Sequence, residues 1–387
     1  MTQTTTRKLS GLALAAAFAF GACTSGATQS PASSQPASSD QASTGPNTPR
    51  PPTGDVTLNG AGATFPALLY QVWIEKFNEA YANISINYQA NGSGAGIKAI
   101  TQQTVDFGAS DAAMKDSEIA ALPAGTKILH FPTALGAVVV IFNIKGVDGN
   151  PITKLNLDAD NVAGIFLGHI KTWNDPAIVA NNPDVASNLP ATPILTIHRS
   201  DGSGTTNAFT SYLDAVSPEW HTSVGAGKSV NWPVGNGAPG NDGVSGSVKQ
   251  SDGAVGYVEL QYAVVSGLSS AAIKNAAGKF VVGSSQGVTD AANAVLASFP
   301  ADFRQAPIIN AAGDTSYPIA SYTYLLVYTD QTDATKGQTL VAFIYWALTA
   351  GQKEEKAIGY APLPDSVDQK ALDQLHQVTT GGAPIWP

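Results

Sequence analysis

The stretch ILTIHRSDGSGTTNAFTSYL, residues 194–213, contains the transition that decides the fold. Its first six residues are typical of a β-strand, the glycine-rich turn SDGSG follows, and the remainder has the pattern of a helix. A strand, a glycine turn and a helix in this order are typical of a parallel sheet whose strands are joined by crossover helices. The stretch therefore predicts an α/β protein.

The same order occurs twice nearer the N-terminus. DVTLNG at 55–60 predicts a strand, and a helix with apolar residues at helical spacing follows from about Thr64. ISINYQ at 84–89 predicts the next strand, which a glycine-rich break separates from another helix. VDFGAS at 105–110 then predicts a short buried strand that ends at Asp111.

Later segments extend the sheet. LGAVVVIFNI at 135–144 is rich in β-branched residues and predicts a buried strand that crosses between two domains. DGAVGYVEL at 252–260 predicts a strand, and the segment 317–330 predicts a return strand. A late helix is expected at 335–351. The folded part, 54–387, is long enough for two domains.

The N-terminus has the pattern of a secretory signal. Residues 1–22 contain Arg7 and Lys8, then a short apolar run and small residues, directly before Cys23. The run is shorter than the about 20 residues that span a bilayer. Cys23 is the only cysteine, and its context resembles a bacterial lipobox, which implies cleavage and lipidation there. A soluble secreted protein with an incidental cysteine is the alternative.

The segment 23–53 is predicted to be a lipidated cysteine followed by a disordered tether. Small polar residues and proline dominate it, with no large apolar residue, so it buries too little surface to fold. The net charge of the chain is −9, which argues against nucleic-acid binding. Because such a charge repels anions at long range, any anion site must depend on local geometry.

Arg199 begins the strongest candidate for a binding site. The strand delivers its guanidinium to a Gly–Ser–Gly–Thr turn that contains Ser203, Gly204 and Thr205 and opens a helix. Unpaired N–H groups at a helix N-terminus, hydroxyl donors and a planar guanidinium together suit an oxyanion. Asp201 would orient the guanidinium. The alternatives are an ordinary capped helix, a surface ion pair of Arg199, and a capping role for Asp201.

Two earlier helix starts contribute further candidates. Thr64 and Phe65 open one helix and Ser93 opens the next, although serine and threonine are routine N-caps. Because ligands of open α/β sheets bind at the carboxyl ends of the strands, we expect these helix starts to converge there with the turn after Arg199.

Asp111 bears on which anion would bind. Hydrogen phosphate carries a proton at neutral pH and sulfate does not, so an ionised aspartate can accept a hydrogen bond from phosphate only. Facing sulfate, the same buried charge would be unpaired. A turn-capping aspartate is the alternative. No P-loop or nucleophile-elbow motif is found, and the five histidines show no spacing for a metal, so we expect neither an enzyme, a metal nor a cofactor.

At these residues the chain resembles the substrate-binding protein of the phosphate-specific ABC transporter. The matching segments occur in order along essentially all of 55–370: LNGAGATFPALLY (58–70), YQANGSGAGIKAI (88–100), VDFGASDAAM (105–114), FPTALGAVVVIFNI (131–144), IFLGHIKTWNDPAI (165–178), RSDGSGTTNAFTSYL (199–213), GNDGVSGSV (240–248), GAVGYVELQYA (253–263) and YAPLPDSV (360–367).

The resemblance implies a two-lobed periplasmic-binding-protein fold of type II, with two mixed sheets flanked by helices and a hinge of two crossovers. Lobe I would comprise 54–136 and 318–387, and lobe II 137–317. A phosphate ion would be dehydrated in the cleft between them. It implies as phosphate ligands Thr64, Phe65, Ser93 and Asp111 from lobe I, and Arg199, Ser203, Gly204 and Thr205 from lobe II, with Asp201 holding Arg199.

The implied function is capture of inorganic phosphate and delivery to ABC permease subunits. We expect a monomer attached to the cell membrane through its lipid only, in the periplasm or on the outer face of the cytoplasmic membrane. Two alternatives remain open at this point. One is a receptor for another oxyanion, such as sulfate, molybdate or arsenate, and the other is a phosphatase-like or adhesion protein that reuses the fold.

Overall fold

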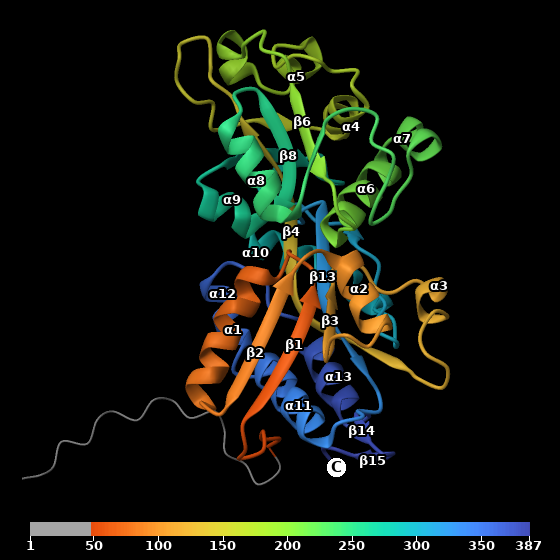
Figure 1. The fold of residues 1–387 in the computed structure, drawn as a ribbon. Helices are drawn as coiled ribbons and strands as arrows, with labels where there is room; N and C mark the ends of the chain where they lie inside the picture. The colour runs from red at the N-terminus through yellow and green to blue at the C-terminus, as the bar shows by residue number, and fades with distance from the viewer. Residues whose placement is uncertain (1–47) are drawn as a thin grey trace, which may run out of the picture. The chain divides into compact units, whose positions relative to one another are not determined.

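The computed structural model describes residues 48–387 (Figure 1). The predicted signal peptide 1–22, the predicted lipidation site Cys23 and most of the predicted tether lie outside the described residues and stay predictions. Within the described part, no helix combines the length and the apolar character that crossing a membrane requires.

Lobe I is built on the sheet order β2-β1-β3-β13-β4. Its strands are β1 (Val56–Gly62), β2 (Ile84–Ala90), β3 (Phe107–Ser110), β4 (Ile128–Asn143) and β13 (Ile319–Tyr328). β1 pairs in parallel with β2 and β3, which confirms the predicted crossover connections, whereas β13 is antiparallel to β3 and β4. The helices are α1 (Ala67–Ala80), α2 (Ser93–Thr101), α3 (Asp116–Ile119), α11 (Ala334–Leu348), α12 (Gln352–Ala357) and α13 (Asp365–Leu375).

Lobe II continues the sheet in the order β4-β8-β6-β7. Its main strands are β6 (Leu195–Arg199), β7 (Asn236–Ala238) and β8 (Ala254–Glu259). Its helices are α4 (Ala159–Leu167), α5 (Pro176–Ala180), α6 (Gly204–Val216), α7 (Pro218–Ser223), α8 (Gly240–Gln250), α9 (Leu260–Ser266) and α10 (Ser285–Val295). β6 is parallel to both β7 and β8, as the strand–turn–helix pattern at 194–213 predicts.

Short elements complete the described chain. The short strands are β5 (Asn156–Leu157), β9 (Ser269–Ser270), β10 (Ala272–Lys274), β11 (Phe280–Val281), β12 (Ile308–Ile309), β14 (Thr379–Thr380) and β15 (Ala383–Pro384). Two 3₁₀-helices span Pro183–Asn188 and Leu296–Ser298. β5, β10 and β11 form a small separate sheet, and β14 and β15 form a hairpin.

The strand β4 belongs to both lobes. Its first part, Ile128 to Ala137, pairs with β13, and its second part, Val138 to Asn143, pairs with β8. Lobe I and lobe II therefore share the strand β4, which joins the two predicted mixed sheets. The physical reason is that the backbone groups of a mostly buried strand need partners along its whole length, which β13 provides for the first part and β8 for the second. The residues at which each lobe begins and ends stay a prediction.

Apolar faces of the helices cover the sheet of lobe I. α1 buries Leu69, Trp73 and Phe77, which recur at helical spacing. Burial of one such side chain stabilises the fold by about 2 kcal/mol. The indole N–H of Trp73 donates to the carbonyl of Gly351 at 2.9 Å, so its polar atom is also satisfied. This packing holds the N-terminus of α1 at the end of β1, where Thr64 and Phe65 lie.

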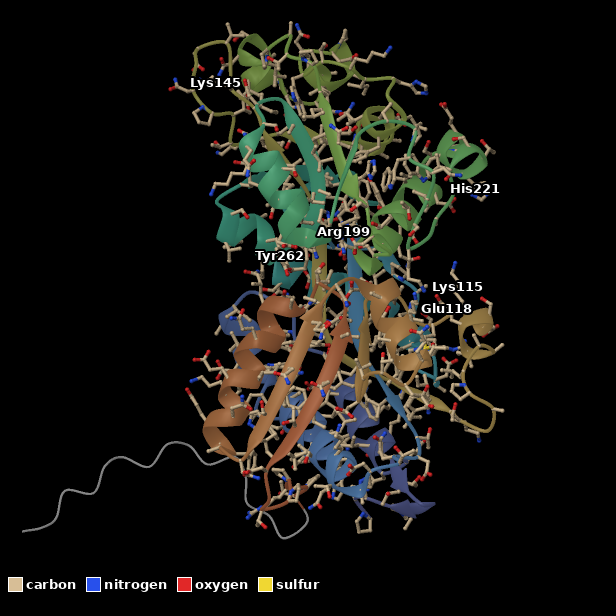
Figure 2. All side chains as sticks on the ribbon, in the orientation of Figure 1. Lys115, Glu118, Lys145, Arg199, His221 and Tyr262 are labelled. Atoms are coloured by element: carbon tan, nitrogen blue, oxygen red, sulfur yellow. The ribbon has the colours of Figure 1, made fainter. Side chains whose placement is uncertain are left out.

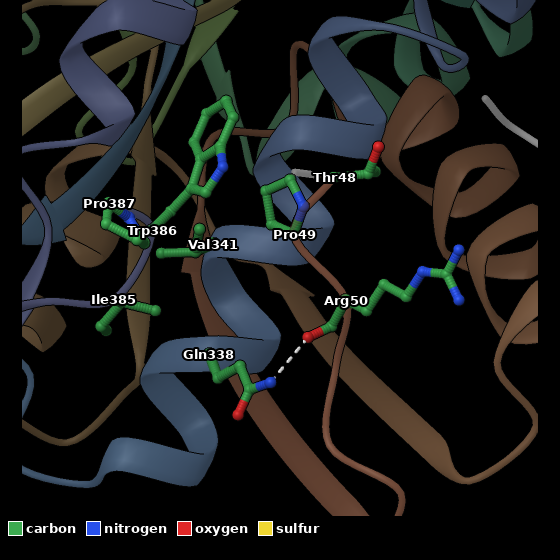
Figure 3. Close-up of a pocket in the computed structure, with 8 residues that line it drawn as sticks. All are labelled: Thr48, Pro49, Arg50, Gln338, Val341, Ile385, Trp386 and Pro387. Carbon is green, nitrogen blue, oxygen red and sulfur yellow. Dashed lines mark hydrogen bonds between the residues drawn. The ribbon is translucent and has the colours of Figure 1, made fainter. Parts of the chain in front are cut away.

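Residues 48–53, the end of the predicted tether, contact the folded part of the chain. The side chain of Gln338 on α11 donates to the carbonyl of Arg50 at 2.9 Å (Figure 3). Asn83 donates to the carbonyl of Pro52 at 3.0 Å. Prolines lack an N–H group, so side-chain donors of this kind tie such a segment down through its carbonyls. A cavity of about 230 Å³ lies here, lined by Thr48, Pro49, Arg50, Gln338, Val341, Ile385, Trp386 and Pro387.

Candidate functional site

Arg199 is the last residue of β6 and is 4% exposed. Figure 2 shows it near the junction of the two lobes. Its guanidinium forms a bidentate pair with Asp201, through Nε at 2.8 Å to Oδ1 and through Nη2 to Oδ2. The ion pair of Arg199 is therefore buried and not on the surface, and both carboxylate oxygens of Asp201 contact its guanidinium. Asp201 Oδ1 also accepts from the N–H of Gly240, at the start of α8, at 3.0 Å.

Asp201 is held in its charged form. Burial raises its pKa, but hydrogen bonds from Arg199 and the positive charge of Arg199 outweigh this, and the pKa lies below its ordinary value. The third nitrogen of the guanidinium, Nη1 of Arg199, does not take part in this pair. Nη1 donates to the hydroxyl of Thr205, in the first turn of α6, at 3.4 Å.

The start of α6 has both a structural and a potential binding role. Ser203 caps the helix, because its Oγ accepts from the N–H of Thr206 at 3.0 Å. Gly204 approaches lobe I so closely that a Cβ added to it would lie 2.5 Å from the Cβ of Asp111. The N–H of Gly204 donates to Ser93 Oγ at 3.0 Å. Only glycine permits this approach of the two lobes.

Asp111 follows β3 and is 2% exposed. Its Oδ1 accepts from Thr323 Oγ1 at 2.9 Å, and its Oδ2 accepts from Ser93 Oγ at 3.3 Å. Burial raises the pKa of Asp111 from 3.8 to about 7, against the opposing effects of the Thr323 hydrogen bond and the charge of Arg199. The carboxyl group therefore exchanges a proton near neutral pH.

Thr64 lies at the same junction. Its hydroxyl accepts from the side chain of Asn241 at 3.0 Å and from the backbone N–H of Asn241 at 3.2 Å. Its carbonyl accepts from the hydroxyl of Tyr262 at 2.6 Å. The carbonyl of the next residue, Phe65, accepts from the hydroxyl of Tyr360 at 2.6 Å. Asn241 and Tyr262 of lobe II thus bind Thr64, which lies just before α1 in lobe I. Tyr360, from the C-terminal part of lobe I, binds Phe65.

Three buried backbone N–H groups stand out in this cluster. Phe65, Ser93 and Thr205 are each fully buried, and their N–H groups have no acceptor among residues 48–387. All three lie at helix starts, where the first N–H groups have no intrahelical partner. A buried, unpaired N–H group is unfavourable by the free energy of a lost hydrogen bond. The cluster therefore offers donors for an anion, one guanidinium, and one carboxyl that can accept a proton.

The structure thus places the predicted anion-binding residues of both lobes in one cluster, whereas the predicted lipidation site Cys23 lies outside the described residues. The described residues contain no group of three or more His, Cys, Asp or Glu side chains placed to hold a metal ion.

Comparison with known proteins identifies the family. Residues 26–350 match the model of the PBP superfamily domain. The phosphate-binding protein PstS of Xylella fastidiosa (strain 9a5c) is 40% identical over 325 residues, covering 83% of this chain and 86% of that protein. PstS of Methanocaldococcus jannaschii is 39% identical over 350 residues, covering 86% and 88%. The chain belongs to the PstS family of phosphate-binding proteins.

Solved structures agree on the fold of this family member. A periplasmic phosphate-binding protein, PfluDING, solved with bound phosphate, superposes with a TM-score of 0.66 at 23% identity, covering 85% of this chain and 96% of that chain. A phosphate-binding protein from Stenotrophomonas maltophilia gives a TM-score of 0.65 at 22% identity, with the same coverage. These similarities support the two-lobed α/β fold.

Sequence reasoning missed several partners of the PstS-family site. Thr323 contacts Asp111 from β13, Asn241 contacts Thr64 from α8, and Tyr262 contacts Thr64 from α9. Asn241 and Tyr262 lie in matching segments, GNDGVSGSV and GAVGYVELQYA, but no motif chemistry distinguished them. A polar residue at a helix start is ordinarily a cap, so only its contacts across the lobes identify it.

Proposed function

We propose that the protein captures inorganic phosphate outside the cytoplasm and delivers it to the permease of an ABC importer, without enzymatic activity. The observation that carries this proposal is the meeting of buried Arg199 from lobe II and buried Asp111 from lobe I in one cluster of donors. A single cation beside a proton-accepting carboxyl suits an oxyanion that itself carries a proton. The names of the PstS relatives support the same ligand.

The proposed ligands follow from the donors in the cluster. Phe65, Ser93 and Thr205 would donate their buried backbone N–H groups, and the hydroxyls of Thr64 and Ser203 and the N–H of Gly204 lie in the same region. Arg199, oriented by Asp201, would supply the formal positive charge. Because the surroundings are dry, each hydrogen bond to the anion is stronger than in water.

Asp111 would select for the proton of phosphate. An ionised Asp111 accepts the P–O–H group, whereas sulfate presents only lone pairs to it. Arsenate also carries a proton at neutral pH, so this device does not exclude arsenate. A nucleophilic role for Ser203 is disfavoured, because its Oγ serves as the cap of α6.

The deciding experiment is calorimetry of the phosphate-stripped protein with phosphate and with sulfate. We expect tight binding of phosphate and at least 100-fold weaker binding of sulfate, by analogy with other sites built to hydrogen-bond a ligand proton. Arg199→Ala should abolish tight binding. Lys336→Ala is the control, since Lys336 pairs with Asp106 inside lobe I. Equal affinity for both anions would refute the role of Asp111, and retention of binding by Arg199→Ala would move the site elsewhere.

We propose that the folded protein is a monomer. Its proposed location at the outer side of the membrane depends on Cys23. Lipidation at Cys23 would anchor the protein to the membrane, while the folded part remains outside the cytoplasm. Fractionation of cells that express Cys23→Ala tests this: the wild-type chain should sediment with membranes and the variant should not. Equal sedimentation of both would contradict the anchor.

A further inference from the structure

Asn241 occupies a position that links the candidate donors of both lobes. It lies in the first turn of α8 in lobe II and is fully buried. Its Nδ2 donates to Thr64 Oγ1 in lobe I at 3.0 Å and to Thr205 Oγ1 in lobe II at 3.4 Å. Its backbone N–H adds a second bond to Thr64 Oγ1 at 3.2 Å. One amide group therefore contacts a hydroxyl from each side of the junction.

The orientation of this amide is determined by its other end. Asn241 Oδ1 accepts from the backbone N–H of Glu259 at 3.3 Å. A flipped amide would set its NH₂ group against that N–H, donor against donor, and would turn its oxygen toward the two hydroxyls. Only the observed orientation satisfies the N–H of Glu259, so the two protons of Nδ2 face Thr64 and Thr205.

The hydrogen bonds that the two threonine hydroxyls accept determine what each hydroxyl can still do. A threonine hydroxyl has two lone pairs and one proton. Thr64 Oγ1 accepts twice from Asn241, and Thr205 Oγ1 accepts from Asn241 and from Nη1 of Arg199. Both lone pairs of each oxygen are therefore used. Each proton remains to be donated, and within residues 48–387 neither hydroxyl donates to another group.

We propose that Asn241 is a positioning residue that aligns the hydroxyls of Thr64 and Thr205 as donors toward bound phosphate. Asn241 does not touch the anion; it fixes where the two hydroxyl protons point. Because Thr64 belongs to lobe I and Thr205 to lobe II, the same amide also couples the donors of the two lobes. The inference rests on the proposed function, since phosphate is the acceptor for both protons.

The test measures phosphate affinity by calorimetry on the purified chain, with the unfolding temperature recorded in phosphate-free buffer. Asn241→Ala frees both hydroxyls to rotate, and we expect an affinity loss of about 10- to 100-fold, as for a few hydrogen bonds. Asn241→Asp keeps the shape of the side chain, but its carboxylate would accept both hydroxyl protons and repel the anion. We expect its loss to be larger than that of Asn241→Ala, and this variant decides the question if Asn241→Ala does not fold.

A double-mutant cycle separates positioning from a general structural role. In the background Thr64→Val with Thr205→Val, which has no hydroxyls to align, Asn241→Ala should lower the affinity by less than about threefold. A merely structural asparagine would lower the affinity equally in both backgrounds. Asn275→Ala is the matched control: Asn275 is a buried asparagine of lobe II whose amide donates to the carbonyls of Gly313, Asp314 and Ser316. It should lower the unfolding temperature and leave the affinity unchanged.

The outcomes distinguish this inference from the proposed function. If the wild-type chain does not bind phosphate, the proposed function fails. If the wild-type chain binds phosphate, two results overturn the inference alone. One is that both Asn241 variants bind phosphate as tightly as the wild-type chain does. The other is that Asn241→Ala lowers the phosphate affinity as much in the Thr64→Val, Thr205→Val background as in the wild-type background.

Discussion

Thr323 Oγ1 donates to Asp111 Oδ1 at 2.9 Å, joining two residues that are 212 positions apart in the chain. Asp111 directly follows β3 of lobe I, and Thr323 lies on β13, by which the chain returns to that lobe. Both side chains are buried, so the bond acts in surroundings where few other groups can stabilise a carboxylate. It therefore lowers a pKa that burial raises.

Thr323→Val should raise the pKa of Asp111 above its present value of about 7, because the variant removes a hydrogen bond to the charged form. At pH 8, phosphate would then bind only after the carboxyl releases a proton, and we expect an affinity loss of about three- to tenfold. Calorimetry in two buffers with different ionisation enthalpies measures that proton release. Thr339→Val, a buried helix threonine bonded to the carbonyl of Thr335, is the control. Unchanged proton release would contradict the prediction.

The raised pKa of Asp111 also predicts how stability depends on pH. Below about pH 4 the carboxyl is protonated in both the folded and the unfolded chain, and up to about pH 7 only the folded chain retains the proton. The free energy of unfolding should therefore fall as the pH rises through this window and level off above it. Burial raises the pKa of Asp368 to about 6 and also raises that of Glu259, so these groups act in the same direction.

Asp111→Asn isolates the contribution of this one carboxyl. The amide does not titrate, so urea unfolding in phosphate-free buffer should show a flatter pH dependence, by about 4 kcal/mol between pH 4 and pH 8. The variant gains stability relative to wild type at the higher pH. Parallel curves for the two proteins would show that Asp111 titrates normally.

The same substitution should change the choice of anion. The Nδ2 group of asparagine donates a hydrogen bond where the carboxylate accepts one, so Asp111→Asn offers sulfate a partner in place of an unpaired charge. We expect the ratio of phosphate to sulfate affinity to fall by at least tenfold, as measured by competition calorimetry. A ratio equal to that of wild type would place the selecting group elsewhere.

An ion pair crosses between the lobes beside the site. Lys228 Nζ contacts Glu118 at 2.5 Å to Oε1 and 2.8 Å to Oε2, and the carbonyl of Lys228 accepts from the N–H of Ser203 at 2.8 Å. Glu118 lies on α3 of lobe I, where Figure 2 labels it. Because partly exposed pairs contribute up to about 1 kcal/mol, Glu118→Gln should speed phosphate dissociation by about two- to fivefold.

Stopped-flow measurement of phosphate release checks this prediction. Added salt should speed release from the wild-type protein more than from Glu118→Gln, since screening weakens the pair. Asp106→Asn breaks a comparable pair with Lys336 inside lobe I and should leave release unchanged. If both variants release phosphate at the wild-type rate, the pair does not hold the lobes together.

Sequence reasoning succeeded wherever the pattern is local. The strands before Asp111 and Arg199, the parallel order and the glycine turn at 200–204 follow from periodicity and from the needs of a tight turn. The sequence predicts that this strand begins at 135, because Pro132 interrupts the pattern of a strand, whereas β4 begins at Ile128. In the structure the pairing with β13 shifts register between Thr323 and Tyr324, and this irregularity accommodates the proline.

The sequence by itself determined the α/β class and the position of Arg199 beside Asp201, since two residues that lie two positions apart at a strand end meet through the local geometry of the chain. Only the tertiary structure decided that Thr323 meets Asp111, that Asn241 meets Thr64 across 177 positions, and that β4 serves both lobes. Such contacts depend on how strands and helices pack after the chain has closed long loops. No short-range pattern encodes that packing, because each side chain alone is equally suited to an ordinary cap or a core position.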